Sequence, residues 1–257
     1  MSLPAFSLQN KTALIIGACN PIGRALALAL AEAGATTAIS TMLPSPREVA
    51  AVQSCGNAIR EMGREGFSQA IDITSETDVD ALVQRTVTEL GSLDILVNAP
   101  DLPFAKPAPE VSLPEWNRVL EVNLTGVYLS CRAAAGPMLQ QQKGRIINVV
   151  SLLGERGMAN GSAYCAAQAG VLNLTRALSQ EWARQGITVN AIGAGWTEGM
   201  GMIADEALQK QLSRYVPQKR LAQPEDIGDA VLTFASEASG FITGQVLWLE
   251  GGVLSRL

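Results

Sequence analysis

The feature that most constrains the fold of this chain is a regular alternation of short apolar runs with longer segments of helical periodicity. Short apolar runs bounded by polar and glycine residues are typical of buried strands. When strands and helices alternate, the strands form a mostly parallel sheet and the helices cover both of its faces. We therefore predict one α/β domain over residues 1–257, with a doubly wound, seven-stranded parallel sheet whose strands lie at 12–16, 37–40, 68–72, 93–98, 145–151, 187–192 and 244–249.

Helical segments fill the intervals between these runs, and several begin at residues that favour a helix start. Ser45 precedes Pro46, and Ser75 precedes the next helical segment, as is common for a cap and a first helical position. The Gly- and Met-rich segment 193–215 contains one short helix and is expected to be a mobile lid. Further helices are expected at 22–33, 45–63, 75–90 and 113–141, around Tyr164 as far as 184, and from Pro224.

Composition narrows the classes of function. Hydrophobic residues make up 47% of the 257 residues, so a sizeable core is expected. The net charge of −5 leaves no basic surface to neutralise phosphates, which argues against a nucleic-acid partner. No apolar run reaches the roughly 18 residues of a membrane span, and Met1-Ser2-Leu3-Pro4 lacks a signal pattern. We expect a cytoplasmic protein with no membrane partner.

The chain has no histidine, which removes much of the usual catalytic chemistry. Neither a Ser–His nor a Cys–His pair can form, and a histidine metal site is equally excluded. The cysteines Cys19, Cys55, Cys131 and Cys165 are scattered without a C-x-x-C spacing, so we expect reduced, buried side chains and no bound metal. Catalysis would have to use Tyr, Ser, Lys, a carboxylate or a cofactor.

Candidate site residues follow the predicted strands. In a parallel α/β sheet the ligand crevice lies beyond the carboxyl ends of the strands. Gly17, Asn98, Ser151 and the loop 193–200 all stand at such ends. Tyr164 comes thirteen residues after Ser151, at the start of the following helix. This clustering predicts a functional site at one edge of the sheet.

An ordered set of motifs makes the chain resemble one family. Gly17-x5-Gly23 follows the first strand, Asp72-Ile73-Thr74 the third and Asn98-Ala99 the fourth. Asn123-Leu124-Thr125-Gly126, Ser151, Tyr164 and Pro224-Glu225-Asp226-Ile227 come in the same order as in that family. From about Leu8 to Gly252 the chain thus resembles the short-chain dehydrogenase/reductase family, especially its β-ketoacyl-reductase-like members. The resemblance implies a Rossmann-type fold and hydride transfer between NAD(P) and an alcohol or ketone.

The same resemblance assigns catalytic roles. Tyr164 would be the general acid/base, Ser151 would position the carbonyl, and Asn123 would order a water molecule. The family also has a lysine four residues after the tyrosine, which lowers its pKa and holds the ribose. This chain has Gln168 there. Free tyrosine titrates near 10 and needs a nearby cation to exchange protons near neutrality. An amide supplies no charge, so the acid/base step is expected to be impaired.

The cofactor platform departs from the family pattern at several positions. Pro21 replaces a glycine of the phosphate turn and removes a backbone N–H group. Ser40, after the second strand, is neither acidic nor basic. Further departures are Pro100, Ala194 and Gly199, and the residues that the resemblance assigns to cofactor binding are Gly17, Pro21, Ile22, Gly23, Ser40, Asp72, Ile73, Asn98, Ala99 and Gly195. We therefore expect a degenerate site that binds no cofactor or only weak NAD(P).

Two functions remain open, with a third possibility of a site redirected to another ligand. The first is a non-catalytic pseudoenzyme subunit that stabilises or regulates an active hydroxyacyl-type dehydrogenase. The second is an active NAD(P)-dependent oxidoreductase acting on a secondary alcohol or ketone, such as a 3-hydroxyacyl or 3-oxoacyl thioester. Some heteromeric hydroxyacyl-CoA dehydrogenases, such as hydroxybenzylsuccinyl-CoA dehydrogenase, pair a competent subunit with a degenerate one. The resemblance thus implies a homo- or heterotetramer with a chain of the same family, the acyl-CoA substrate lying on the partner.

Overall fold

The computed structural model describes residues 6–200 and 205–255. The amino-terminal residues 1–4 and the lid residues 201–204 considered above lie outside this range. The strands are β1 (Thr12–Ile16), β2 (Thr36–Ser40), β3 (Gly66–Gln69), β4 (Ile95–Asn98), β5 (Gly144–Ser151), β6 (Ile187–Ala194) and β7 (Val246–Leu249). The α-helices are α1 (Pro21–Glu32), α2 (Pro46–Glu61), α3 (Glu76–Leu90), α4 (Leu113–Leu120), α5 (Gly126–Gln141), α6 (Ser162–Trp182), α7 (Glu206–Tyr215), α8 (Pro224–Gly228) and α9 (Val231–Ala235).

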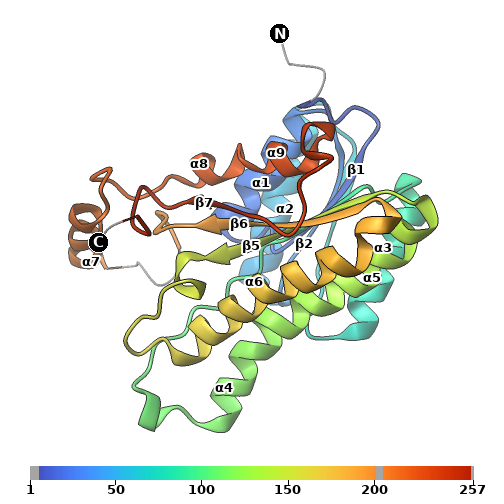
Figure 1. The fold of residues 1–257 in the computed structure, drawn as a ribbon. Helices are drawn as coiled ribbons and strands as arrows, with labels where there is room; N and C mark the ends of the chain where they lie inside the picture. Colours follow the sequence, from blue (N-terminus) through green and yellow to red (C-terminus); the bar gives the residue numbers. More distant parts are fainter. Residues whose placement is uncertain (1–5, 201–204, 256–257) are drawn as a thin grey trace.

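The strands form one parallel sheet in the order β3-β2-β1-β4-β5-β6-β7 (Figure 1). The order reverses between β1 and β4, since the chain runs outward to β3 and then returns to the other side of β1. This is the doubly wound arrangement, and it confirms the predicted Rossmann-type α/β fold with seven parallel strands.

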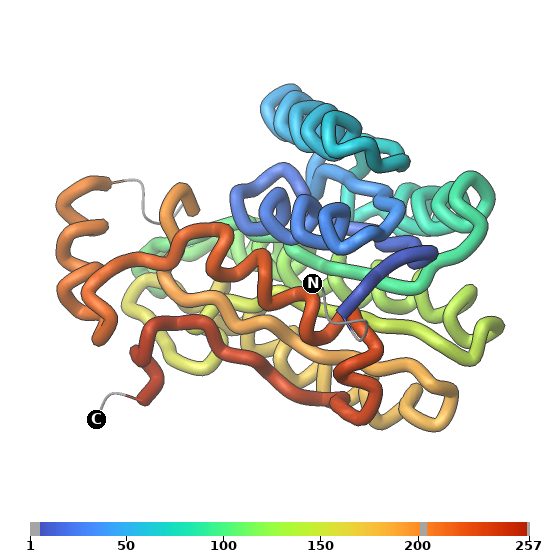
Figure 2. The backbone as a smooth tube through the Cα atoms, turned by 90° about the horizontal axis from the view of Figure 1, so that it is seen from above, coloured from blue at the N-terminus to red at the C-terminus, as the bar shows by residue number. Residues whose placement is uncertain are grey.

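Both faces of the sheet are buried beneath helices. Along β1, Ala13 and Ile15 pack into a core with residues of α1, α2, α8 and α9, whereas Leu14 and Ile16 pack with residues of α3, α5 and α6. Figure 2 shows the two helical layers on opposite sides of the sheet. Because both faces need apolar side chains, the strand is apolar at nearly every position, which is why its sequence shows a continuous run.

The third strand was predicted at 68–72, and this placement is wrong. The ladder with β2 begins at Gly66 and ends at Gln69. Beyond it, the hydroxyl of Thr41 accepts the N–H of Ile71 at 2.9 Å and donates to the carbonyl of Ile71 at 2.9 Å. A side chain therefore satisfies the backbone that the prediction placed in the ladder.

Several other boundaries differ from the prediction by one or two residues; for example, β6 ends at Ala194 and β7 begins at Val246. The fourth strand begins at Ile95 and not at Leu93, whose N–H and carbonyl both bond to the Gln141 side chain. The helix predicted over 113–141 is interrupted between α4 and α5 by one π-helical segment, η3 (Glu121–Thr125). Such π-helical turns often occur at functional sites, and this one carries Asn123.

None of the helices within residues 6–200 and 205–255 combines the length and the apolar character that crossing a lipid bilayer requires.

Candidate functional site

A cavity of about 260 Å³ lies at the carboxyl ends of the strands, beside the point where the strand order reverses. Gly17 has a φ of +90°, and a Cβ atom there would lie 2.5 Å from the carbonyl oxygen of Ala99, so the turn after β1 approaches β4 through a glycine. The cavity is lined by Asn20, Ile22, Ala99, Pro100, Asp101, Ala105, Val149, Val150, Ser151, Leu153, Met158, Tyr164, Gln168, Ala194, Gly195, Trp196, Thr197, Met200, Leu208 and Leu212.

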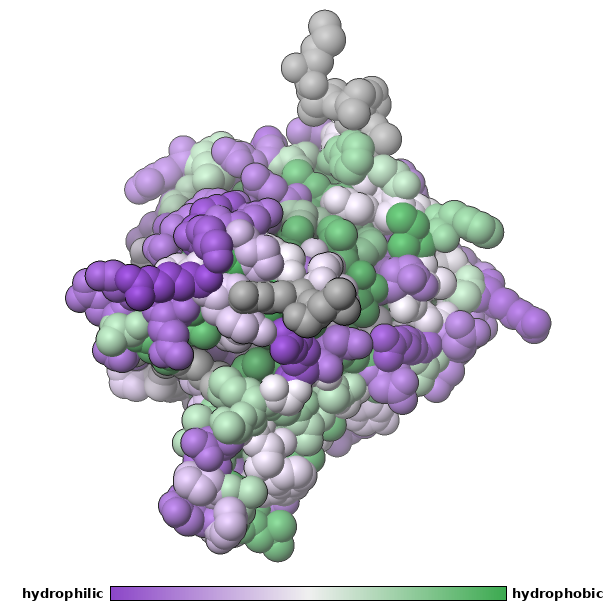
Figure 3. Space-filling model, turned by 60° about the vertical axis from the view of Figure 1, so that its left-hand side comes forward, coloured by the Kyte–Doolittle hydropathy of each residue, from purple (hydrophilic) through white to green (hydrophobic). Residues whose placement is uncertain are grey.

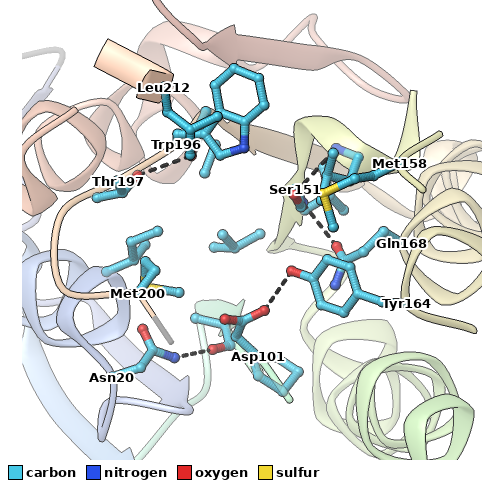
Figure 4. Close-up of a pocket in the computed structure, with 18 of the residues that line it drawn as sticks. Asn20, Asp101, Ser151, Met158, Tyr164, Gln168, Trp196, Thr197, Met200 and Leu212 are labelled. Carbon is cyan, nitrogen blue, oxygen red and sulfur yellow. Dashed lines mark hydrogen bonds between the residues drawn. The ribbon is translucent and has the colours of Figure 1, made fainter. Parts of the chain in front are cut away.

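Tyr164 extends from α6 into this cavity and is 4% exposed. Its hydroxyl donates a hydrogen bond of 2.6 Å to Oδ1 of Asp101, in the loop after β4 (Figure 4). Burial raises the pKa of Tyr164 well above its ordinary value, and the neighbouring Asp101 carboxylate raises it further. Burial also raises the pKa of Asp101 to about 6, against the opposing effect of the hydrogen bond from Tyr164.

Sequence reasoning missed Asp101, as it missed Asn20 and Glu48. Asp101 stands three residues after Asn98, the last residue of β4, in a stretch that is otherwise apolar or proline. Its position alone could have identified it, because a carboxylate just after a central strand lies at the edge of the sheet where ligands bind.

Gln168 follows Tyr164 by four residues and is 2% exposed. Its Oε1 accepts the backbone N–H of Ser151 at 2.8 Å. Because the oxygen is fixed by this bond, the amide nitrogen points the other way, and it donates to no protein atom within the part of the chain that the structure describes. Ser151 also lines the cavity, and its Oγ accepts the N–H of Leu153 at 3.2 Å.

Asn123 holds the loop that carries Asp101. Its Oδ1 accepts the N–H of Leu102 at 2.8 Å, and its Nδ2 donates to the carbonyl of Leu102 at 2.9 Å. The residue is 1% exposed and is not among those that line the cavity. Its amide therefore fixes the backbone next to Asp101.

The amino terminus of α1 is the turn at which a pyrophosphate binds in this type of fold. Pro21 occupies its first position and has no N–H group. The side chain of Asn20 accepts the N–H of Gly23 at 2.9 Å and donates to the carbonyl of Ala99 at 2.7 Å. Within the described chain, Ile22 thus provides the one first-turn N–H that has no protein acceptor.

In this fold the ribose of a dinucleotide lies beyond the end of β2, and in this chain the carboxylate of Glu48 lies there. Oε2 of Glu48 accepts the S–H of Cys19 at 3.1 Å and the backbone N–H groups of Met42 and Leu43 at 3.1 and 2.9 Å. Glu48 therefore links the turn after β1 to the loop after β2. The Glu48 carboxylate thereby takes up donor groups of both the turn after β1 and the loop after β2.

The residues expected near adenine also bond within the chain. The N–H of Ile73 donates to the carbonyl of Met42 at 2.9 Å. Oδ1 of Asp72 accepts both the N–H and the hydroxyl of Thr74, at 2.9 and 2.7 Å. In this structure, several hydrogen-bonding groups on the adenosine side are thus bonded within the chain.

The structure thus divides the predicted site residues into two groups. Those that line the cavity are Tyr164, Ser151, Gln168, Ile22, Ala99 and Gly195, with the departures Pro100 and Ala194. Those that do not line it are Asn123, Gly17, Pro21, Gly23, Ser40, Asp72, Ile73 and Asn98. Asn98 is fully buried within the sheet, where its amide donates to Oδ1 of Asn148 at 2.9 Å.

The loop after β6 and α7 form the outer wall of the cavity. Trp196 meets the ring of Tyr215 edge to face, with the centroids 5.5 Å apart, and Leu208 and Leu212 of α7 complete the wall. Figure 3 brings this side of the molecule forward and shows hydrophobic surface between hydrophilic projections.

The fold and the arrangement of Ser151 and Tyr164 define a dehydrogenase-type protein, and a family model supports this. The model described as enoyl-(acyl carrier protein) reductase matches residues 17–254. The chain belongs to the short-chain dehydrogenase/reductase family.

Particular relatives span nearly the whole chain. It is 38% identical to cis-4-hydroxycyclohexanecarboxylate dehydrogenase of Sinomonas cyclohexanicum, over 96% of this chain and 97% of that protein. It is 34% identical to the (2S)-[(R)-hydroxy(phenyl)methyl]succinyl-CoA dehydrogenase subunit BbsD of Thauera aromatica, over 95% and 97%. Gluconate 5-dehydrogenase from Burkholderia cenocepacia, solved in complex with NADP and tartrate, is similar with a TM-score of 0.90 and 30% identity, over 98% of both chains.

Proposed function

We propose that this chain is a non-catalytic short-chain dehydrogenase-type subunit that stabilises or regulates an active hydroxyacyl-type dehydrogenase partner. The observation that carries the proposal is the hydrogen bond from Tyr164 to Asp101, with the neutral Gln168 where a cation would stand. An ammonium group stabilises the tyrosinate, whereas a carboxylate and burial stabilise the protonated phenol. Loss of general acid/base assistance lowers a rate by about 10²–10⁴-fold.

The cofactor platform supports the same proposal. Pro21 and Asn20 leave the α1 terminus with little capacity for an anion, because one N–H is missing and the N–H of Gly23 is already bonded. Glu48 and Ile73 use hydrogen-bonding groups on the adenosine side. A dinucleotide would have to displace all of these bonds, so affinity for NAD(P) is expected to be absent or weak.

Exposed apolar side chains support an assembled state. Leu113 on α4 is 70% exposed and Tyr128 on α5 is 43% exposed, while Phe241 before β7 is fully exposed. The family resemblance implies assembly through the helix after Leu113 and the helix that bears Tyr164, with the carboxyl-terminal strand as a second contact. The relative named as a dehydrogenase subunit favours a heteromer.

The test is to purify the tagged chain from its native source and identify what accompanies it. A second short-chain dehydrogenase-type chain is expected, and the complex should oxidise a hydroxyacyl-CoA. Tyr164→Phe in this chain should leave that rate within about twofold, while replacing the catalytic tyrosine of the partner should abolish it. A fully active homotetramer would refute the proposal.

The second candidate is an active NAD(P)-dependent oxidoreductase for a secondary alcohol or ketone, including a 3-hydroxyacyl thioester. It is favoured by the presence of Ser151 and Tyr164 on the same cavity, and by relatives that are named as dehydrogenases. Loss of activity in the Tyr164→Phe variant of the purified chain would support this candidate over the first.

A further inference from the structure

The charge of the cavity is unusual for a nucleotide-binding fold. Asp101 is the one ionisable carboxylate among its lining residues, and no Lys or Arg of the described chain lines it. Within the described residues, the cavity therefore presents a negative charge without a counter-ion.

Within residues 6–200 and 205–255, one side chain donates to Asp101, the neutral hydroxyl of Tyr164 on Oδ1. An ionised carboxylate taken out of water is unfavourable unless it is paired or bonded several times. Oδ2 receives no protein hydrogen bond within the described residues. Asp101 is half-buried and lines the cavity, so its carboxylate can meet a ligand there. The group that best completes this environment is a cation.

The remaining wall of the cavity is largely apolar. Leu153, Met158, Trp196 and Leu212 surround the space, together with alanines, valines and Pro100. A volume of about 260 Å³ lies just below the usual range for drug-sized ligands, which selects a small molecule. An apolar body fits these walls, since its burial releases water from apolar surface.

A second polar contact is available on the side of α6. Gln168 is 2% exposed, and its amide nitrogen has no protein acceptor within the described residues, although it belongs to a cavity-lining side chain. Gln168 lines the cavity and its Nε2 is not among the buried side-chain atoms that lack a partner, so this nitrogen can donate to a ligand that brings an acceptor oxygen. Phosphates and carboxylates would satisfy this donor but would be repelled by Asp101.

We propose that this cavity binds a small organic ammonium ion, a primary or secondary amine with an apolar body, whose nitrogen pairs with Asp101. A hydroxyl or carbonyl oxygen on the same molecule would accept from Gln168. The site is then a ligand-binding site of a dehydrogenase-type fold that does not require a nucleotide. This inference does not depend on whether the chain assembles with an active partner.

The test is isothermal titration of the full-length protein at pH 8 with cyclohexylamine, cyclohexanol and cyclohexanecarboxylate, which share one apolar ring and differ in charge. Cyclohexylamine should bind at least about tenfold more tightly than cyclohexanol, a difference of about 1.4 kcal/mol, and cyclohexanecarboxylate should bind most weakly. Equal affinities for the amine and the alcohol, or tighter binding of the carboxylate, would overturn the proposal without any variant.

Two variants test whether the preference for the amine depends on Asp101. Asp101→Asn keeps the shape of the side chain and should abolish the preference for the amine while cyclohexanol binding persists. Asp229→Asn removes an exposed carboxylate that does not line the cavity, and it should leave the preference unchanged. An amine preference that survives Asp101→Asn would show that the ammonium binds elsewhere and would overturn the assignment.

Discussion

The Tyr164 hydroxyl and Oδ1 of Asp101 lie 2.6 Å apart, and the phenol is the donor. Two separate segments bring them together, since Tyr164 lies in the first turn of α6 and Asp101 follows β4. The Leu102 backbone next to Asp101 is held at both its N–H and its carbonyl by Asn123. In this arrangement the tyrosine is bonded to an anion, and the pKa of Tyr164 is raised well above its ordinary value. The proposed absence of catalysis rests on this pair.

Removing the charge of Asp101 should stabilise the protein at neutral pH. The pKa of this carboxyl is about 6 in the folded state against 3.8 ordinarily, so the folded chain binds more protons between these values. The free energy of unfolding therefore falls as pH rises from about 4 to about 6, and stays lower above that window. Asp101→Asn should exceed the wild type by about 1–3 kcal/mol at pH 7.5 and by little at pH 4.

Urea unfolding at pH 4, 5, 6 and 7.5 measures this difference. The exposed Asp229→Asn serves as the control and should follow the wild-type curve at every pH. A variant at Asp101 that is less stable than the wild type at pH 7.5 would contradict the inferred unfavourable burial of its charge.

Restoring a lysine at position 168 should not by itself restore turnover. Gln168→Lys introduces the cation that the phenol lacks, but Pro21 and Glu48 still impede a dinucleotide. It also removes the acceptor of the Ser151 N–H, which is expected to lower the free energy of unfolding by about 1–3 kcal/mol. Oxidation of NADH or NADPH with a 3-oxoacyl thioester checks this. Ketone reduction by the single variant would mean that only the acid/base step had been lost.

Glu48 should contribute to stability through the bonds it accepts. Glu48→Ala leaves the N–H groups of Met42 and Leu43 without their acceptor, which is expected to cost about 1–3 kcal/mol. Glu48→Gln keeps a carbonyl oxygen and should lose less. Glu61→Ala, at the exposed end of the same helix, should change stability by less than about 0.5 kcal/mol in the same urea experiment. Equal losses at Glu48 and Glu61 would argue against the proposed role of Glu48 as a link between the two loops.

The fold was predictable from the sequence because both faces of the sheet require apolar residues. The unbroken apolar run at β1 therefore identified a buried parallel strand, and the capping serines located the starts of α2 and α3. The boundary of β3 was not predictable, since it depends on the side chain of Thr41, thirty residues away in sequence. A hydrogen bond between residues so far apart in the chain produces no pattern in the local sequence.

The site was predictable only in part, for a related reason. Tyr164, Ser151 and Gln168 stand at recognisable spacings, and the structure places all three on one cavity. Asp101 is not part of any motif with a characteristic spacing. Its hydrogen bond with Tyr164 forms because the loop after β4 lies next to α6 in the folded structure. In the sequence, Glu48 likewise has the pattern of an ordinary first-turn helix residue. Only the structure shows that it accepts hydrogen bonds from the loop after β2.

The most direct test of the central claim is a calorimetric titration of the purified chain with NAD⁺, NADH, NADP⁺ and NADPH, run beside an active 3-oxoacyl reductase of the same family. The hydrogen bonds within the adenosine side and the missing N–H of Pro21 lead us to predict no saturable binding of any of the four at millimolar concentrations. Micromolar binding of any one of them to this chain would contradict the proposal of a non-catalytic subunit with a degenerate cofactor site.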